Sequence, residues 1–414
     1  MSFDFFQVVS VSAFLAQLAS FAPAFKTEQA SLQDSLGRVL GRDIMAEEDL
    51  PPFHRSGMDG FAIRAADVFG TSETNPAYLS LKGDIGIDRL PDFAIRPGQC
   101  ARIVTGAGLP EGADSVIMME YTEELGDGDI EIRRSIVPGE NVMYRGEDCE
   151  QGDLVLTAGT LLRAPELGLL AALGQQEVYC YTQPSIGVLS TGNEIVPAKA
   201  SPQPGQIRDV NAPVIRALVQ QNGARAVSFG IVPDDRKLLQ HSLEQALEQC
   251  DAVLLSGGSS VGSKDISMEA IEHMEQAQVL AHGVALSPGK PTILANIKQK
   301  PLLGLPGQVT SAQVVMHVLV IPFLRHLSGC RHPFDRSWWP SRKGYLTRNV
   351  SSKPGREDYI RVRLEETESG SYAATPLLGM SGLLRTMLGA QGLVRIPANL
   401  EGLKQEEPVE VYLI

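Results

Sequence analysis

Residues 251–268 read DAVLLSGGSSVGSKDISM. Residues 252–255 have the length and composition of a buried strand, and the spacing of apolar residues from Ile266 onward indicates a helix. Between them lie serines and glycines, which let a ligand approach the backbone N–H groups at the start of a helix. The segment therefore predicts either an ordinary strand-to-helix turn or a cradle for an anion.

The surrounding residues, 184–331, alternate between strand and helix patterns. SIGVLSTG (185–192) and AVSFGIV (226–232) are predicted strands, and each is followed by a helical pattern, the first of which we expect Asn211 to cap. Alternation at this spacing is typical of βαβ units and a parallel sheet, with ligand loops at the carboxyl ends of the strands. A doubly wound α/β domain is therefore predicted here.

The flanking segments differ in character. Residues 1–50 are predicted to be mainly helical, with a second helix whose face is formed by Leu32, Leu36, Val39 and Leu40. Residues 54–145 and 332–414 consist of short strand patterns between turn residues. The chain is thus predicted to be multidomain, α+β and α/β, with four parts: a helical or mixed linking domain of 1–53 and 146–183, an inserted β-rich lobe of 54–145, the parallel α/β domain of 184–331, and a C-terminal β domain of 332–414.

The bulk composition excludes several classes of function. A net charge of −13 over 414 residues argues against nucleic acid as the main partner, because phosphate backbones need a basic surface. The five cysteines are scattered without a CxxC pair, which disfavours a zinc site or a disulfide framework and favours the cytoplasm. We also find no apolar run of the roughly 18 residues that a membrane span needs.

Several loops carry residue types suited to anion or Mg²⁺ chemistry. Asp59 lies among small residues in SGMDGFA, Glu194 follows the first predicted strand of the α/β domain, and Lys290 lies in the stiff loop PGKP. Each acidic residue taken alone has a simpler interpretation: Asp59 as an Asp in a tight turn, and Glu194 as an exposed acid in a loop. Together, loops of this kind at the ends of parallel strands predict a phosphate-bearing ligand, with Mg²⁺ as a possible companion.

The motifs form an ordered series: SGMDGFAIRAAD, RIVTGAGLPEGADSVIMME, RGEDCEQGD, STGNEIV, GQIRDVN, SGGSSVGSKD, SPGKP and GLPGQVTSA. In this order and spacing the chain resembles the molybdopterin molybdenumtransferase family (MoeA-type, gephyrin E domain-like). The resemblance implies an elongated four-domain homodimer with a MogA-like third domain and a C-terminal β-barrel-like domain. It also implies that molybdate is inserted into adenylylated molybdopterin with Mg²⁺ and release of AMP. Transient partners would be the molybdopterin adenylyltransferase and molybdoenzyme apoproteins or their chaperones.

The resemblance assigns roles residue by residue. The implied catalytic residues are Asp59, Thr105, Asp148, Glu194, Asp234, Asp265 and Lys290. Those implied to bind molybdopterin are Ser256, Gly257, Gly258, Ser259, Ser260, Gly262, Gly289, Pro306, Gly307 and Ser311. Arg356 and Ser381 are implied on the molybdate side, and Asp59, Glu194 and Asp265 are candidate Mg²⁺ ligands.

Two departures from the family pattern leave alternatives open. Ser287 stands where the family usually has Lys or Arg before PGKP, and GLPGQVTS replaces the usual GLPGNPVS. Losing a cation from an oxyanion site weakens binding, because charge-assisted hydrogen bonds are roughly twice as strong as neutral ones. The alternatives are a non-catalytic molybdopterin carrier or scaffold, an insertase with another oxyanion preference such as tungstate, and a nucleotide hydrolase of the competence/damage-inducible type. The matching outer domains disfavour the hydrolase.

Overall fold

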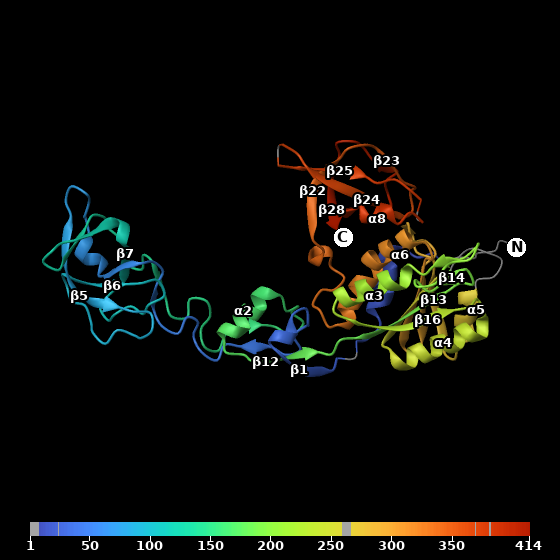
Figure 1. Ribbon diagram of the computed structural model, residues 1–414, viewed down its shortest axis with the longest axis horizontal. Coiled ribbons are helices and arrows are strands. Elements are labelled where there is room, and N and C mark those ends of the chain that lie inside the picture. Colours follow the sequence, from blue (N-terminus) through green and yellow to red (C-terminus); the bar gives the residue numbers. More distant parts are fainter. Residues whose placement is uncertain (1–7, 24, 259–265, 369, 381) are drawn as a thin grey trace. The chain divides into compact units, whose positions relative to one another are not determined.

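The computed structural model describes residues 8–23, 25–258, 266–368, 370–380 and 382–414 (Figure 1). The chain forms two compact units. The first comprises Met1–Gly41, Gly159–Arg163 and Tyr179–Ile414, and the second comprises Arg42–Ala158 and Ala164–Val178. Because the second unit is inserted twice into the first, each unit is assembled from segments that are distant in sequence.

A six-stranded sheet forms the centre of the first unit, in the order β16-β13-β17-β21-β20-β18. The first four strands run parallel, and β20 and β18 are antiparallel to their neighbours. The strands are β13 (Ser185–Thr191), β16 (Arg225–Val232), β17 (Ala252–Ser256), β18 (Ala277–His282), β20 (Ile293–Ile297) and β21 (Lys300–Leu305). Every residue of β13 and β17 is buried, as expected for strands covered on both faces. This confirms the predicted doubly wound α/β fold.

Helices cover both faces of this sheet (Figure 1). One apolar cluster joins the sheet to α1, α3, α6 and α7, and a second joins it to α4 and α5. The helices are α1 (Val11–Ala19), α3 (Asn211–Gln221), α4 (Arg236–Gln249), α5 (Ile266–Glu272), α6 (Val309–Val315) and α7 (Ile321–Leu327), with a π-helical turn (Met316–Val320) between α6 and α7. By length and hydropathy, Val309–Leu327 could cross a membrane, contrary to our expectation, but 78% of its most apolar window is buried inside the protein.

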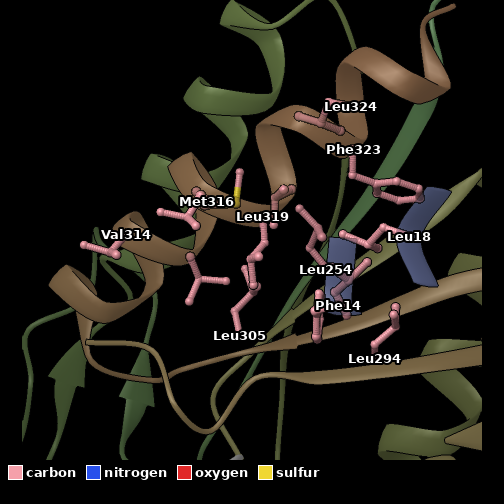
Figure 2. Packing of buried hydrophobic residues seen from close by; sticks show 14 of the residues in the cluster. Phe14, Leu18, Leu254, Leu294, Leu305, Val314, Met316, Leu319, Phe323 and Leu324 are labelled. Carbon is pink, nitrogen blue, oxygen red and sulfur yellow. The ribbon is translucent and has the colours of Figure 1, made fainter. Parts of the chain in front are cut away.

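Helix α1 packs into the core of the α/β sheet. Its buried residues Val11, Phe14 and Leu18 belong to the same cluster as Leu254 and Phe323. Figure 2 shows Phe14 and Leu18 facing this cluster from the side opposite α6. The apolar face of α1 therefore finds its partners on α7 and the sheet.

The predicted helix over residues 32–40 is wrong. The structure has β1 (Thr27–Ser31), a 3₁₀ turn (Gln33–Ser35), and bridges from Val39 to Leu161 and from Leu40 to Cys180. Gly37 adopts a φ of +75°, which interrupts any helix at that point. Helix α2 (Ala164–Ala172) lies within residues 146–183, which were predicted to be helical or mixed.

The second unit contains the expected β-rich lobe, a six-stranded sheet in the order β7-β4-β6-β5-β9-β8. Its strands are β4 (Gly60–Ile63), β5 (Ala77–Ile85), β6 (Gln99–Ile103), β7 (Ser115–Met118), β8 (Thr122–Glu124) and β9 (Asp129–Ile132). All of them fall within the predicted 54–145 segment.

Short two-stranded pairs occur in both units. They are β1 with β12 (Glu177–Tyr181), β2 (Ile44–Met45) with β11 (Leu154–Leu156), β3 (Arg55–Ser56) with β10 (Val142–Met143), β14 (Ile195–Val196) with β15 (Ile207–Arg208), and β23 (Val350–Ser351) with β27 (Gly402–Leu403).

The C-terminal strands close on themselves. The order β24-β25-β22-β28-β26 returns to β24 through an antiparallel β24–β26 pairing, so five strands form a closed barrel. The strands are β22 (Ser341–Leu346), β24 (Glu357–Glu366), β25 (Tyr372–Pro376), β26 (Gly392–Ile396) and β28 (Pro408–Leu413), with the short helix α8 (Arg385–Leu388) between β25 and β26. Outside the ring, β19 (Leu286–Ser287) pairs in parallel with β24 and connects the barrel to the α/β part.

Candidate functional site

The carboxyl ends of β13 and β17 define the candidate site. From β13 the chain passes to β16 on one side and then to β17 on the other, so the winding direction reverses between β13 and β17. Ligands of open α/β sheets bind at such a reversal, outside the carboxyl ends of the strands. A cavity of about 500 Å³ lies there.

The cavity brings together many of the predicted ligand-binding residues. Seven of them line it: Glu194, Ser256, Gly257, Gly258, Pro306, Gly307 and Ser311. These residues come from the ends of β13, β17 and β21 and from the first turn of α6, so four separate segments meet around one space. The volume falls within the range of small-molecule and cofactor sites.

Two glycines let the chain pass close to the cavity wall. Gly257 and Gly258 have φ values of +97° and +69°, a region that side-chain-bearing residues rarely adopt. A Cβ on Gly257 would lie 2.2 Å from the carbonyl oxygen of Thr191, and one on Gly258 would lie 2.1 Å from Ser267 Oγ. Glycine is therefore required at both positions by conformation and by space.

Asn211, at the start of α3, holds two walls of the cavity together. Its Nδ2 donates to Ser256 Oγ at 2.7 Å and to the Gly307 carbonyl oxygen at 2.8 Å. Because a carbonyl can only accept, this orientation fixes Nδ2 toward Gly307 and leaves Oδ1 as an acceptor. Asn211 is 7% exposed and its Oδ1 has no hydrogen-bond partner among the described residues.

Ser190 supplies a second polar atom of this kind. It is 3% exposed, lines the same cavity, and its Oγ has no partner within the described chain. Buried polar atoms normally have partners, so these two oxygens indicate a ligand or ordered water. Sequence reasoning missed both residues as contacts. We had expected Asn211 to cap α3, but Asp209 Oδ1 performs that role by accepting from the N–H groups of Asn211 and Ala212.

Asp234 positions a loop at the edge of the cavity. Its Oδ1 accepts from Thr191 Oγ1 at 3.0 Å and its Oδ2 accepts from the Asn193 N–H at 3.2 Å. Asp234 itself does not line the cavity. Its neighbour Asp235 caps α4, accepting from the N–H of Leu238.

The Gly289–Lys290 loop lies next to the barrel. Lys290 is exposed, and its neighbour Pro291 lines the cavity. Thr292 Oγ1 donates to the Gly289 carbonyl oxygen at 2.7 Å, which holds the loop in place.

The predicted molybdate-side residue Arg356 is brought close to this loop by strand pairing. Ser287 is in register with Asp358, and Arg356 forms an ion pair with Asp358, with Nε and Oδ1 2.8 Å apart. Ser287 carries no charge, and Arg356, directly before β24, is already paired with the buried carboxylate of Asp358.

Asp59 and Thr105 form a hydrogen-bonded pair in the second unit. Asp59 Oδ1 accepts from the Thr105 N–H at 2.7 Å and from Thr105 Oγ1 at 2.8 Å. These bonds, the backbone one foremost, hold the pKa of Asp59 below its usual range. Asp59 is followed by Gly60, where a Cβ would lie 1.9 Å from the Ile117 carbonyl oxygen, so the carboxylate is presented on a closely packed turn.

Asp148 lies elsewhere in the same unit. It is exposed, its N–H donates to the Leu50 carbonyl oxygen at 2.9 Å, and it lines an open hollow beside Cys149 and Asp153. Ser259, Ser260, Gly262, Asp265 and Ser381 lie outside the described residues. Within the residues that are described, no three His, Cys, Asp or Glu side chains are grouped so that they could hold a metal ion.

Comparison with known proteins covers nearly the whole chain. Residues 9–174 match the model of the MoeA N-terminal region (domain I and II), residues 187–326 match a probable molybdopterin binding domain, and residues 343–414 match the MoeA C-terminal region (domain IV). A molybdopterin molybdenumtransferase of Bacillus subtilis is 30% identical, with 98% of this chain and 94% of that protein covered. A putative molybdopterin biosynthesis protein of Methanocaldococcus jannaschii is 33% identical, with 94% and 92% covered.

Solved structures agree with these matches. The crystal structure of a molybdopterin biosynthesis moeA protein from Pyrococcus horikoshii OT3 has a TM-score of 0.81 and 28% sequence identity, covering 99% of this chain and 100% of that one. The family match and the structural match therefore span the same multidomain arrangement, including the segment that contains the cavity.

Proposed function

The chain belongs to the MoeA family of molybdenum cofactor biosynthesis proteins, and from that membership we propose its reaction: insertion of molybdate into adenylylated molybdopterin with release of AMP. In this reaction an oxygen of water attacks the phosphoanhydride and AMP leaves, and the two dithiolene sulfurs replace one oxo group of molybdate, which leaves as water with the two thiol protons. The cavity between β13 and β17 is the proposed binding site for the molybdopterin part.

The observation that carries this proposal is a pair of buried oxygens, Ser190 Oγ and Asn211 Oδ1, that have no partner among the residues the structure describes. A pterin ring has N–H donors along one edge, and Asn211 Oδ1 can only accept, so the two are complementary. Gly257 and Gly258 line the cavity and are partly exposed, and glycines at the end of a strand let a phosphate group approach the backbone. The cavity thus offers acceptors for a ring and a glycine-lined wall for an anion.

Mg²⁺ is part of the proposal. Two carboxylates line the cavity, Glu194 and Asp209, and Asp209 Oδ1 already accepts from two backbone N–H groups, so Glu194 is the proposed ligand. Mg²⁺ commonly uses one or two carboxylates together with substrate phosphates. Bound there, it would neutralise charge on the phosphoanhydride. From the family resemblance we also propose a cytoplasmic homodimer that receives its substrate from the adenylyltransferase and passes its product to molybdoenzyme apoproteins or their chaperones.

The test is an AMP-release assay. Purified protein is mixed with adenylylated molybdopterin, Mg²⁺ and molybdate, and AMP and active molybdenum cofactor are measured beside a known family member. Both products are expected, with Glu194→Gln slowing AMP release and the exposed-site variant Glu401→Gln leaving it unchanged. If the known member gives both products and this protein gives neither, the proposal is wrong. Replacing molybdate by tungstate in the same assay tests the oxyanion preference.

A second candidate function follows from the Ser287 loop. Ser287 lies opposite Asp358 in the strand pairing and carries no positive charge that could help to bind molybdate. The competing proposal is therefore a carrier that binds molybdopterin but does not turn it over. It predicts molybdopterin binding without AMP release, and release that appears in Ser287→Lys but not in Ser287→Ala. Full activity of the natural protein would exclude the carrier.

A further inference from the structure

A small hollow of about 100 Å³ lies at the carboxyl-terminal ends of α3 and α7 in the first unit. Arg38, Arg325 and Ser328 line it, and we propose that it binds a small tetrahedral oxyanion such as inorganic phosphate. It is separate from the cavity described above, because Asn211 begins α3 and the hollow adjoins Gln221–Gly223 at the far end, roughly 15 Å along the helix.

Three polar groups around the hollow lack partners. Arg38 Nε, Arg325 Nε and Ser328 Oγ are buried and make no hydrogen bond within the described chain. Ser328 is 6% exposed, so bulk water does not satisfy it. Leaving a buried donor unsatisfied is unfavourable, so three such groups on residues that line one hollow indicate a bound group with acceptor atoms.

The other contacts of the two arginines leave these donors available. Arg38 Nη2 donates to the Glu28 carboxylate and to the Tyr181 carbonyl oxygen. The Arg325 guanidinium lies over the Trp338 ring, 4.7 Å from its centroid. Stacking uses the face of a guanidinium and leaves its N–H edge free to bind an anion.

The local charge favours an anion over water alone. Of the described residues that line the hollow, two are arginines and none is an aspartate or glutamate. Glu28, which contacts Arg38, has a side chain that is 50% exposed, and it balances one of the two charges. The carboxyl-terminal ends of α3 and α7 carry partial negative charge of about half an electron each, which opposes an anion but is smaller than the full charges of the two guanidinium groups.

Size and geometry define the ligand class. A hollow of this volume holds one tetrahedral oxyanion and excludes a nucleotide or a pterin. Guanidinium groups bind phosphate oxygens in a bidentate, charge-assisted manner, and a serine hydroxyl adds a third donor. The proposal does not depend on the reaction proposed above.

The experiment is equilibrium dialysis of the full-length protein with radiolabelled inorganic phosphate. We expect Arg325→Gln to weaken one phosphate site roughly tenfold or more and Ser328→Ala to weaken it roughly two- to tenfold. The matched control is Arg342→Gln, at an exposed arginine on β22, which should bind as the natural protein does. AMP should not displace phosphate from this site, which separates a free oxyanion from the phosphate group of a larger molecule.

Two outcomes would overturn the proposal. One is superimposable binding curves for the natural protein, Arg325→Gln and Ser328→Ala. The other is a crystal structure with phosphate in which the hollow contains water only. Because Arg325→Gln also removes the stacking on Trp338, folding is checked by circular dichroism, and Ser328→Ala tests the site without disturbing that contact.

Discussion

The orientation of the Asn211 amide can be tested by an almost isosteric change, Asn211→Asp. The natural side chain donates from Nδ2 to the Gly307 carbonyl oxygen at 2.8 Å and to Ser256 Oγ at 2.7 Å. In the variant an acceptor faces the Gly307 carbonyl at that distance, whereas the Ser256 hydroxyl can rotate to donate. We therefore expect the loss of at least one net hydrogen bond and a new repulsion, together about 2 kcal/mol of unfolding free energy.

Denaturant unfolding followed by tryptophan fluorescence measures this effect, because Trp338 and Trp339 are the two tryptophans of the chain and both lie in the first unit. Asn399→Asp, at an exposed turn position of that unit, is the matched control and should be unchanged. Unaltered stability of Asn211→Asp would refute the argument, because the amide could not then be making both bonds.

The ligand gives an independent check of the same orientation. Asn211→Asp keeps an acceptor where Oδ1 lies, but Asn211→Ala removes it. We expect Asn211→Ala to weaken molybdopterin binding roughly tenfold, the equivalent of about one hydrogen bond, measured by fluorescence titration. Equal affinity of Asn211→Ala and the natural protein would mean that Oδ1 does not contact the ligand.

Three further predictions follow from individual contacts. Gly258→Ala should abolish molybdopterin binding, since its Cβ would lie 2.1 Å from Ser267 Oγ at a φ of +69°; restored titration in a Gly258→Ala, Ser267→Ala double variant would show that crowding rather than backbone strain dominates. Thr105→Val removes the hydroxyl hydrogen bond to Asp59 and should raise the pKa of Asp59 toward its usual value, as measured by carbon NMR titration. The folding stability linked to the lowered pKa of Asp59 is present at neutral pH and is lost as the pH falls. Burial lowers the pKa of His317 to about 4 from 6.5, so unfolding free energy should fall by about 2 kcal/mol between pH 8 and pH 5, and His317→Leu should flatten this dependence.

The α/β part of the fold could be predicted because its local patterns are unambiguous. Residues 252–255 are apolar without interruption and β17 is buried throughout, and the helical spacing after Asp235 coincides with α4. The positions of several candidate site residues followed from the rule that ligand loops lie at strand carboxyl ends. Glu194, Gly257 and Gly307 do line one cavity.

The errors arise where a local pattern has two structural solutions. Leucine spacing over residues 32–40 fits a helix, but it also fits a segment that forms isolated bridges, and Gly37 decides between them. The role of Asn211 depends on Gly307, 96 residues further along the chain, so no local pattern could indicate it. The closed β24–β26 pairing of the barrel is likewise a property of strands that meet in space.

The burial of α1 has a consequence for synthesis of the chain on the ribosome. Helix α1 leads into Phe21, whose carbonyl oxygen accepts from the ring of His326, 305 residues later. At about 5–20 residues per second, His326 and the rest of α7 emerge roughly 15–60 s after α1 itself. Until then Phe14 and Leu18 lack the part of their covering surface that α7 supplies. The nascent chain therefore presents an apolar helix for chaperones to bind, and the first unit can close only when translation is almost complete.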